Sequence, residues 1–155
     1  MDTPPIFSLR PATAADDAAI HALIRAVEIN PMGLDWRHFI LAVDAGGQMI
    51  GCGQVKQHGD GSYELASIAV VPEWRGRGVA RAVIIHLLDA YSAEHPGQLL
   101  YLTCLARLGP LYERFGFRAI GPDEMTPYFR RIHRIAGWFG KLGRMPDKLL
   151  VMVHE

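Results

Sequence analysis

The stretch from Ile68 to Ala80 constrains the fold most, because an apolar run passes there directly into a glycine-containing turn and then into helical periodicity. Residues 68–71 are apolar and are followed by Pro72, which is typical of a strand that ends. Apolar residues then recur every three or four positions up to Tyr91, which predicts a helix with one buried face. The stretch therefore predicts a strand end, a turn and a helix start in immediate succession.

This junction predicts a binding site for an anion, and a pyrophosphate is the expected ligand. Glycine lets the backbone approach a phosphate closely, and a helix N-terminus adds unpaired N–H groups and a partial positive charge. The turn matches neither the dinucleotide fingerprint Gly-x-Gly-x-x-Gly nor the Lys-Ser/Thr ending of a P-loop. From Gly76 and Gly78 alone, a plain tight turn between strand and helix stays open as the alternative.

The rest of the chain alternates between strand-like and helix-like patterns. Strands are expected over residues 6–9, 39–43, 49–55, 63–71, 99–103, 117–120 and 149–153. Helices are expected from the Thr13–Asp16 capping box to Asn30-Pro31, after Gly78 as far as His95-Pro96, from Pro110 to Phe115, and over Phe129 to Leu142. Gly137 and Gly140 weaken the last of these helices.

Length and composition predict one domain. The chain has 155 residues, 50% of them hydrophobic, so a single domain with one substantial core is expected over residues 1–155. The formal net charge of +0 argues against a nucleic-acid-binding protein. Residues 1–64 carry four basic and eight acidic residues, whereas residues 65–155 carry twelve and eight. An anionic small ligand therefore suits the later part of the chain better.

Cysteine usage and hydropathy favour a cytoplasmic protein. Cys52 and Cys104 are too few for a disulfide framework or a recognisable zinc site, so no metal is expected. No run approaches the roughly 18 apolar residues that a membrane span needs. Residues 1–5 lack the pattern of a signal peptide, so neither export nor membrane insertion is expected.

Three motifs occur in order along the chain: Leu9 to Thr13 with Asp16, Arg75 to Ala80, and Leu111 to Phe117. Together they resemble motifs of the GNAT superfamily of acetyl-CoA-dependent N-acetyltransferases. Arg75-Gly76-Arg77-Gly78-Val79-Ala80 matches the family's central Arg/Gln-x-x-Gly-x-Gly/Ala loop, and it follows a strand that ends in Val-x-Pro. Leu111-Tyr112-Glu113-Arg114-Phe115-Gly116-Phe117 looks like the family's Leu-Tyr-x-x-x-Gly-Phe segment. Leu9-Arg10-Pro11-Ala12-Thr13 with Asp16 looks like its common opening. The resemblance covers the chain from about Leu9 to Phe117.

The resemblance implies an α+β fold, in which helices flank a mixed, mostly antiparallel twisted sheet that is splayed between its fourth and fifth strands. It implies that backbone groups of Ile68, Ala69 and Val70 pair with the pantetheine arm of acetyl-CoA. The loop of Arg75 and Gly76, with the amides of Arg77, Gly78, Val79 and Ala80, would hold the pyrophosphate. The side chains of Arg75 and Arg77 would add charge near the phosphates or lie in solvent, and both readings stay open.

Acetyl transfer needs a neutral amine and a proton, or another form of charge stabilisation, for the departing thiolate. The resemblance implies that Tyr112 donates to the thiolate; its ordinary pKa near 10 keeps it protonated, and core packing is the alternative role. Glu64 is the first candidate for the base, with Glu73 and His58 behind it, and a surface glutamate is the alternative reading. Cys104 has no evident base partner and is expected to be a small buried hydrophobe.

The chain departs from the family at two places. Many relatives carry an Asn and a small residue where this chain has Leu105 and Leu108. The segment at about residues 122–148 also matches poorly, and Pro127 to Lys148 is expected to form a helical lid over the acceptor pocket. The predicted function is N-acetylation by direct attack on acetyl-CoA, with a small molecule or amino acid rather than a protein as the acceptor. No nucleic-acid or membrane partner is expected, and a homodimer stays open.

Two other functions stay open from the sequence. The first is a non-catalytic coenzyme-A-binding regulatory module, which the missing Asn favours. The second is a protein that uses Arg-Gly-Arg-Gly and the basic segment up to Lys148 to bind nucleic acid or a membrane surface. A solvated helix face would explain the same basic residues.

Overall fold

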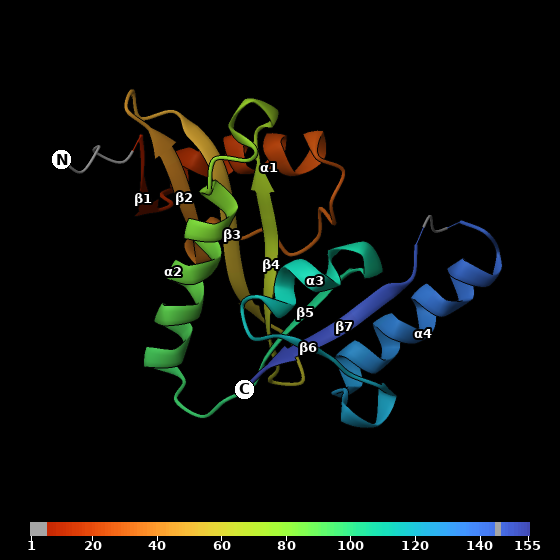
Figure 1. Cartoon of the computed structure of the whole chain (residues 1–155). Helices are drawn as coiled ribbons and strands as arrows, with labels where there is room; N and C mark the ends of the chain where they lie inside the picture. Colours follow the sequence, from red (N-terminus) through yellow and green to blue (C-terminus); the bar gives the residue numbers. More distant parts are fainter. Residues whose placement is uncertain (1–5, 145–146) are drawn as a thin grey trace. The chain divides into compact units, whose positions relative to one another are not determined.

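The computed structural model describes residues 6–144 and 147–155 and divides into two compact units (Figure 1). The first unit runs up to Lys56 and again from Leu65 to Glu94; the second comprises Gln57–Glu64 and His95–Glu155. The single domain predicted over residues 1–155 stays a prediction. Residues 1–5, on which the expected lack of a signal peptide rests, lie outside the described ranges.

Seven strands are hydrogen-bonded in the order β1-β2-β3-β4-β5-β7-β6. Their bounds are β1 Phe7–Pro11, β2 Phe39–Asp44, β3 Met49–Gln57, β4 Tyr63–Val70, β5 Leu100–Leu105, β6 Arg118–Ala119 and β7 Leu149–His154. The pairs β1–β2, β2–β3, β5–β7 and β6–β7 are antiparallel. The parallel pair β4–β5 joins Tyr63 to Leu100 and Glu64 to Tyr101, the first two residues of each strand. The predicted mixed, mostly antiparallel sheet is therefore confirmed.

In the part of the chain that the structure describes, four α-helices accompany the strands, and short 3-10 helices join several of them. The α-helices are α1 Asp17–Ala26, α2 Val79–Glu94, α3 Gly109–Glu113 and α4 Pro127–Lys141. The 3-10 helices are Ala14–Asp16, Trp36–His38, Pro72–Trp74, Ala106–Leu108 and Pro122–Glu124. Within the described ranges, none of the helices combines the length and apolarity that a membrane span requires.

The 3-10 helix Ala14–Asp16, which leads directly into α1, starts with the predicted capping pattern. The Thr13 N–H donates to Asp16 Oδ2 at 2.7 Å, and Arg10 donates to both carboxylate oxygens of Asp16 at 2.8 and 2.9 Å. These bonds hold the pKa of Asp16 well below its usual range, with the Arg10 hydrogen bond as the largest cause. Further along, Ile20 and Ile24 are buried in the core of the first unit.

Helix α2 lies against β3 at two glycines in the first unit (Figure 1). A Cβ added at Gly51 would stand 2.7 Å from Val79 Cγ1, and one added at Gly53 would stand 2.7 Å from Val83 Cγ1. Real Cβ atoms do not approach other carbons so closely, so only glycine permits this contact. The two glycines thus bring the first turns of α2 directly onto the strand.

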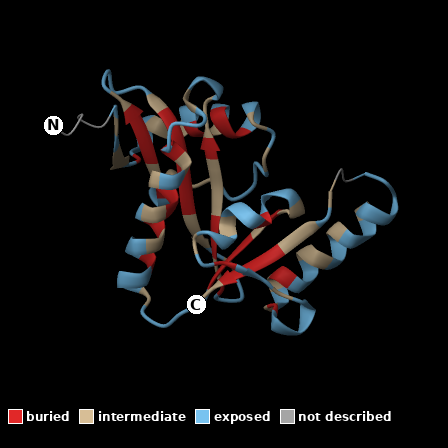
Figure 2. Ribbon diagram, viewed as in Figure 1, coloured by how far each residue is buried: buried red, intermediate tan, exposed pale blue. Residues whose placement is uncertain are grey.

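The second unit contains α3, α4 and strands β5, β6 and β7. Phe129 on α4 is fully buried and packs with Tyr101, Met125, Val151 and Val153. Beyond this first turn, α4 is mostly exposed or intermediate along its length (Figure 2). Large apolar side chains at Ile135, Trp138 and Leu142 are among the exposed ones.

Most predicted elements occur, with shifted ends. The first strand covers residues 7–11 rather than 6–9, and β6 has two residues where four were predicted, residues 117–120. Helix α4 runs through Gly137 and Gly140 and ends at Lys141, so these glycines do not interrupt it. Residues 145 and 146 of the predicted lid segment lie outside the described ranges.

Candidate active site

The glycine turn of the first unit has the backbone conformation that its sequence predicts. A 3-10 helix over Pro72–Trp74 ends β4, and Gly76 and Gly78 follow with φ of +76° and +82°. These values lie in the left-handed region, which residues with a Cβ rarely adopt. Ideal Cβ atoms at both positions would meet nothing within 4 Å, so backbone conformation rather than crowding calls for glycine here.

Helix α2 begins at Val79, immediately after the second of these glycines. The Ala82 N–H donates to the Gly78 carbonyl at 3.0 Å, which closes the first turn of the helix. The amides of the first turn therefore have no intrahelical acceptor, and the helix dipole adds a partial positive charge there. Because Arg75, Gly76, Arg77 and Gly78 are all exposed, a ligand can reach this end of the helix.

The two arginine side chains of the turn are held in different ways. Arg75 Nε donates to the Val70 carbonyl at 3.4 Å, a long bond that returns the side chain toward β4. The Arg77 guanidinium carbon lies 4.9 Å from the centroid of the Trp74 ring, in a cation–π contact. Both residues keep a positive charge beside the glycine turn.

The end of β4 carries Ile68, Ala69 and Val70 directly after a backbone irregularity. Ser67 has a φ of +59°, an uncommon value for a residue with a side chain. The fully buried Gln54 holds this position, because its Nε2 donates to Ser67 Oγ at 2.9 Å and to the Gly33 carbonyl at 3.2 Å. Gln54 Oε1 has no hydrogen-bond partner among the described residues. Neither Gln54 nor Ser67 is signalled by a sequence motif.

In the second unit, Glu64 and His58 form a buried pair. His58 Nε2 lies 2.8 Å from Glu64 Oε1, and Thr103 Oγ1 donates to Glu64 Oε2 at 3.3 Å. The side chains of His58 and Glu64 are only 11% and 8% exposed. The surface reading of Glu64 is therefore wrong, because burial and hydrogen bonding set this carboxylate apart from a solvated one.

Aromatic rings of α4 enclose the His58 imidazole. The Tyr128 ring is stacked on it, with 3.5 Å between centroids and 14° between planes. The Phe129 ring meets it edge-on, with 5.6 Å between centroids. Burial raises the pKa of Tyr128, and the negative charge of Glu64 raises it further.

The turn that carries His58 also supports the start of α4. Asp60 Oδ2 accepts the Tyr128 N–H at 2.9 Å, and Asp60 Oδ1 accepts the Ser62 N–H at 2.9 Å. Burial opposes ionisation of Asp60, but hydrogen bonds from Ser62, Tyr128 and Thr126 outweigh it and hold the pKa of Asp60 well below its usual range. The position of α4 next to His58 is therefore fixed by a charged hydrogen-bond acceptor.

Tyr112 lies on the short helix α3 of the second unit, partly buried and edge-on to Phe117 at 6.2 Å between ring centroids. Burial, followed by the nearby Cys104, raises the pKa of Tyr112 to about 12. The expectation of an ordinary pKa near 10 is therefore wrong, because the hydroxyl is removed from water. Tyr112 remains a hydrogen-bond donor over the whole neutral range.

The other sequence candidates have different surroundings. Burial raises the pKa of Cys52 to about 12 and that of Cys104 to about 11, so both are protonated thiols at neutral pH. Cys104 lies 3.8 Å from Met152 Sδ, which fits the predicted small buried hydrophobe. Glu73 is exposed in the first unit, whereas His58 and Glu64 are in direct contact in the second.

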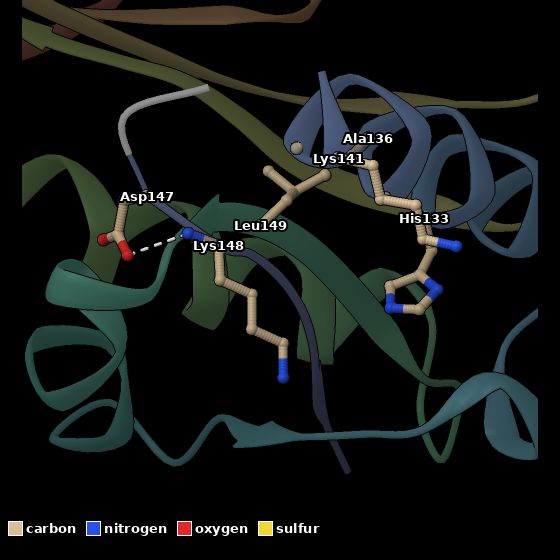
Figure 3. A pocket seen from close by; sticks show the side chains of 8 residues that line it. His133, Ala136, Lys141, Asp147, Lys148 and Leu149 are labelled. Carbon is tan, nitrogen blue, oxygen red and sulfur yellow. Dashed lines mark hydrogen bonds between the residues drawn. The ribbon is translucent and has the colours of Figure 1, made fainter. Parts of the chain in front are cut away.

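A cavity that no motif predicted lies beside α4 in the second unit (Figure 3). It has a volume of about 480 Å³. Its lining comprises His133, Ala136, Gly137, Gly140 and Lys141 of α4 with Asp147, Lys148 and Leu149. The Lys148 N–H donates to Asp147 Oδ1 at 2.8 Å at its edge.

Comparison with protein families gives one match that covers more than half of the chain. A family model described as an acetyltransferase (GNAT) domain matches residues 35–119. Comparison with curated proteins gives no match.

Solved structures extend the comparison to the fold of nearly the whole chain. N-acetylglutamate synthase from Neisseria gonorrhoeae, complexed with coenzyme A and N-acetyl-glutamate, is 20% identical with a TM-score of 0.75. The match covers 98% of this chain but 35% of that one, so this chain spans about a third of the synthase. Rv2747 from Mycobacterium tuberculosis, in complex with CoA and NLQ, is 22% identical with a TM-score of 0.71. The match covers 95% of this chain and 98% of that one. A GCN5-related N-acetyltransferase from Kribbella flavida is 20% identical with a TM-score of 0.66. The match covers 98% of this chain and 99% of that one.

Proposed function

Because the chain belongs to the GNAT acetyltransferase family, we propose that it moves an acetyl group from acetyl-CoA to an amine by direct attack in a ternary complex. The observation that carries this proposal is the junction of β4, the two glycines with positive φ, and the exposed start of α2. Backbone N–H groups at such a junction suit an anion of the size of a pyrophosphate. Two of the similar structures are complexes with coenzyme A, which supports the choice of donor.

In this proposal the first unit holds the cofactor. The pyrophosphate lies on the amides of Arg77, Gly78, Val79 and Ala80, with Arg75 and Gly76 completing the loop. The charges of Arg75 and Arg77 attract the phosphates from beside the turn. Backbone groups of Ile68, Ala69 and Val70 pair with the pantetheine arm, and these residues lie beyond the two positions at which β4 pairs with β5.

The second unit supplies the groups that move protons. The acceptor amine has to lose a proton before it can attack, and we assign this step to the pair formed by Glu64 and His58. Burial of the pair and its short hydrogen bond support that role. Tyr112 donates a hydrogen bond to the sulfur as the thiolate departs, and its raised pKa keeps the hydrogen on the oxygen until then.

No covalent enzyme intermediate is part of this proposal. Burial holds the thiols of Cys52 and Cys104 in their protonated forms, in which they are poor nucleophiles. The acetyl group therefore passes directly from the thioester carbon to the amine nitrogen. This direct route requires both substrates to be bound at the same time.

The acceptor is proposed to be a small molecule or an amino acid. The synthase from Neisseria gonorrhoeae is described in complex with N-acetyl-glutamate, which supports an amino acid as the acceptor of a protein with this fold. We further propose that α4 and the residues after it, up to Lys148, cover the acceptor and govern its choice. Cytoplasmic location and the oligomeric state stay predictions.

A second function is favoured by one specific observation. Leu105 stands at the end of β5, at the position where the resemblance to the family implies an Asn that contacts the cofactor arm. A non-catalytic coenzyme-A-binding module would tolerate that change better than an enzyme would. Turnover decides between the two functions.

The experiment has two parts. Calorimetry with acetyl-CoA should show binding, and a screen of amines with acetyl-CoA should show release of free thiol for at least one acceptor. Binding without turnover of any amine would favour the regulatory module. An absence of binding would contradict both functions.

A further inference from the structure

The buried pair of His58 and Glu64 differs from a lone carboxylate base, because both carboxylate oxygens already make contacts with other side chains. Glu64 Oε1 lies against His58 Nε2 at 2.8 Å, and Glu64 Oε2 accepts from Thr103 at 3.3 Å. Both oxygens of Glu64 are therefore engaged by other side chains. A proton that leaves the substrate would reach Glu64 only in competition with these two hydrogen bonds.

His58 is the member of the pair that has an unoccupied atom. Its Nε2 faces Glu64, and its Nδ1 has no hydrogen-bond partner among the residues that the structure describes. A carboxylate at one ring nitrogen favours the tautomer with hydrogen on that nitrogen, which leaves the other nitrogen free to accept a proton. Imidazole is also the side chain whose charge ordinarily changes near neutral pH.

The ring is fixed in place on several sides. The His58 N–H donates to the Ser62 carbonyl at 2.8 Å, and the Gly61 N–H donates to the His58 carbonyl at 2.9 Å, so the turn anchors its backbone. Tyr128 covers one ring face, and Phe129 meets the ring edge-on. A residue that only filled space would not need a hydrogen-bonded carboxylate in addition to this aromatic packing.

We propose that His58 takes the proton of the acceptor amine, and that Glu64 is the positioning residue that orients the imidazole and stabilises its charged form. This inference rests on the proposed acetyltransferase function. It assigns the proton to a different atom from the one that the sequence favoured.

The step balances as follows. One N–H proton of the acceptor ammonium moves to His58 Nδ1, which leaves a lone pair on the amine nitrogen. That lone pair forms the C–N bond with the thioester carbon, and the C–S bond then breaks. The proton that the nitrogen loses on becoming an amide balances the one that the coenzyme A sulfur gains, and the imidazolium of His58 returns its proton to water.

Two conservative variants separate the roles of the pair. His58→Gln keeps a donor near the position of Nε2 but cannot take a proton, so kcat/KM should fall by about 10²-fold or more. The acidic limb of its pH–rate profile should disappear. Glu64→Gln keeps shape and hydrogen bonding but removes the charge, so the loss should be smaller and the acidic limb should move to lower pH, because imidazolium is then less stabilised.

The reverse pattern would overturn the inference. If Glu64→Gln abolishes the acidic limb while His58→Gln keeps more than half of the wild-type rate, the carboxylate is the base. Circular dichroism shows whether His58→Gln folds. If it does not fold, Glu64→Gln decides alone: a shifted acidic limb supports His58 as the base, and an abolished limb supports Glu64. Besides Glu64, the titratable and charged groups around these rings among the described residues are Asp60, Tyr101, Tyr128 and Arg131, and none of them is altered in either variant.

A matched control exists in the first unit. His21 Nδ1 lies 3.6 Å from Asp17 Oδ1, another contact between a histidine and a carboxylate, but both side chains are 40% exposed or more. His21→Gln should leave kcat/KM and the pH profile unchanged. If the wild-type chain turns over no amine, the proposed function fails as a whole. If it turns over but His58→Gln matches wild type, only the present inference fails.

Discussion

The ring of Tyr128 lies flat on the ring of His58, with centroids 3.5 Å apart and planes 14° from parallel. The two residues are far apart in the chain, one in the turn after β3 and the other in the first turn of α4. Their contact connects the segment that departs from the family pattern with the buried pair. A change at Tyr128 should therefore reach the proton-handling groups through this ring.

Tyr128→Leu should raise the KM for the amine about two- to tenfold, because stacked aromatic pairs contribute about 0.5–1.5 kcal/mol. Tyr128→Phe keeps the stack and should behave like wild type in this respect. Acetyl-CoA affinity, measured by calorimetry, should be nearly the same in all three proteins. Equal losses of amine and acetyl-CoA affinity would show that α4 is structural support and not part of the acceptor site.

Gly78→Glu should abolish acetyl-CoA binding, because it places a carboxylate and side-chain bulk where the pyrophosphate is proposed to lie. Gly47→Glu is a matched control, since Gly47 has the same φ of +82° and the same open surroundings as Gly78. Both variants carry the same backbone strain, so a difference in calorimetric affinity reports on the ligand. Unchanged affinity in a folded Gly78→Glu protein would exclude this turn as the binding site.

Tyr112→Phe should lower turnover by about 10²-fold, the usual contribution of a positioned proton donor, with acetyl-CoA affinity little changed. Since burial raises the pKa of Tyr112 to about 12, its ionisation should not reduce the wild-type rate until the pH approaches that value. The profile is measured where chemistry limits the rate. If the variant keeps more than half of the wild-type rate, Tyr112 serves packing and backbone donors or water assist the thiolate.

Gly51→Ala should destabilise the protein and weaken acetyl-CoA binding together. Its Cβ would stand 2.7 Å from Val79 Cγ1 and 3.1 Å from the Ala69 carbonyl, so the start of α2 has to move. Overpacking of this kind costs about 1–3 kcal/mol, which lowers Tm by about 2–10 °C in a chain of this size. Gly59→Ala, where a Cβ would meet nothing within 4 Å, is the control and should change neither quantity. A stable Gly51→Ala protein would argue against tight packing of α2.

Asp60→Asn should reduce thermal stability at neutral pH, and the reduction should become smaller as the pH falls below the ordinary carboxylate range. The pKa of Asp60 is lowered in the folded state, so its ionisation stabilises the fold above the ordinary carboxylate pKa of about 3.9 and this contribution is lost as the pH falls below it. The Tm difference from wild type should therefore stay constant from pH 7 to about pH 4 and shrink below about pH 4. Asp89→Asn, on the exposed side of α2, is the matched surface control. A Tm difference independent of pH would show that charge on Asp60 plays no part.

The glycine turn could be predicted from sequence because its cause is local. Two glycines, a preceding strand and a following helix lie within residues 68–80, and positive φ at Gly76 and Gly78 needs no distant partner. The same holds for the capping of the 3-10 helix before α1, where the interacting residues are only three apart. Features that depend only on residues close together in the chain can be predicted from a single sequence.

The proton-handling pair could be predicted only in part. The sequence pointed to a turn over residues 58–61 and to both His58 and Glu64, but it could not show that the hairpin brings their side chains to 2.8 Å. Thr103 and Tyr128 reach the pair through tertiary structure alone. The raised pKa of Tyr112 was missed for a similar reason. Its burial depends on tertiary packing, which residues close to it in sequence do not indicate.

The support that Asp60 gives to α4 bears on the order in which the chain folds. Thr126, the residue before the helix, makes no capping hydrogen bond with its own side chain, and the acceptor for the Tyr128 amide comes from a turn 68 residues earlier. Closing so long a loop is entropically slow, so contacts of this range form late in folding. The first turn of α4 should thus gain protection from hydrogen exchange only after the β3–β4 hairpin has formed, and newly made chains should complete this helix among their last elements.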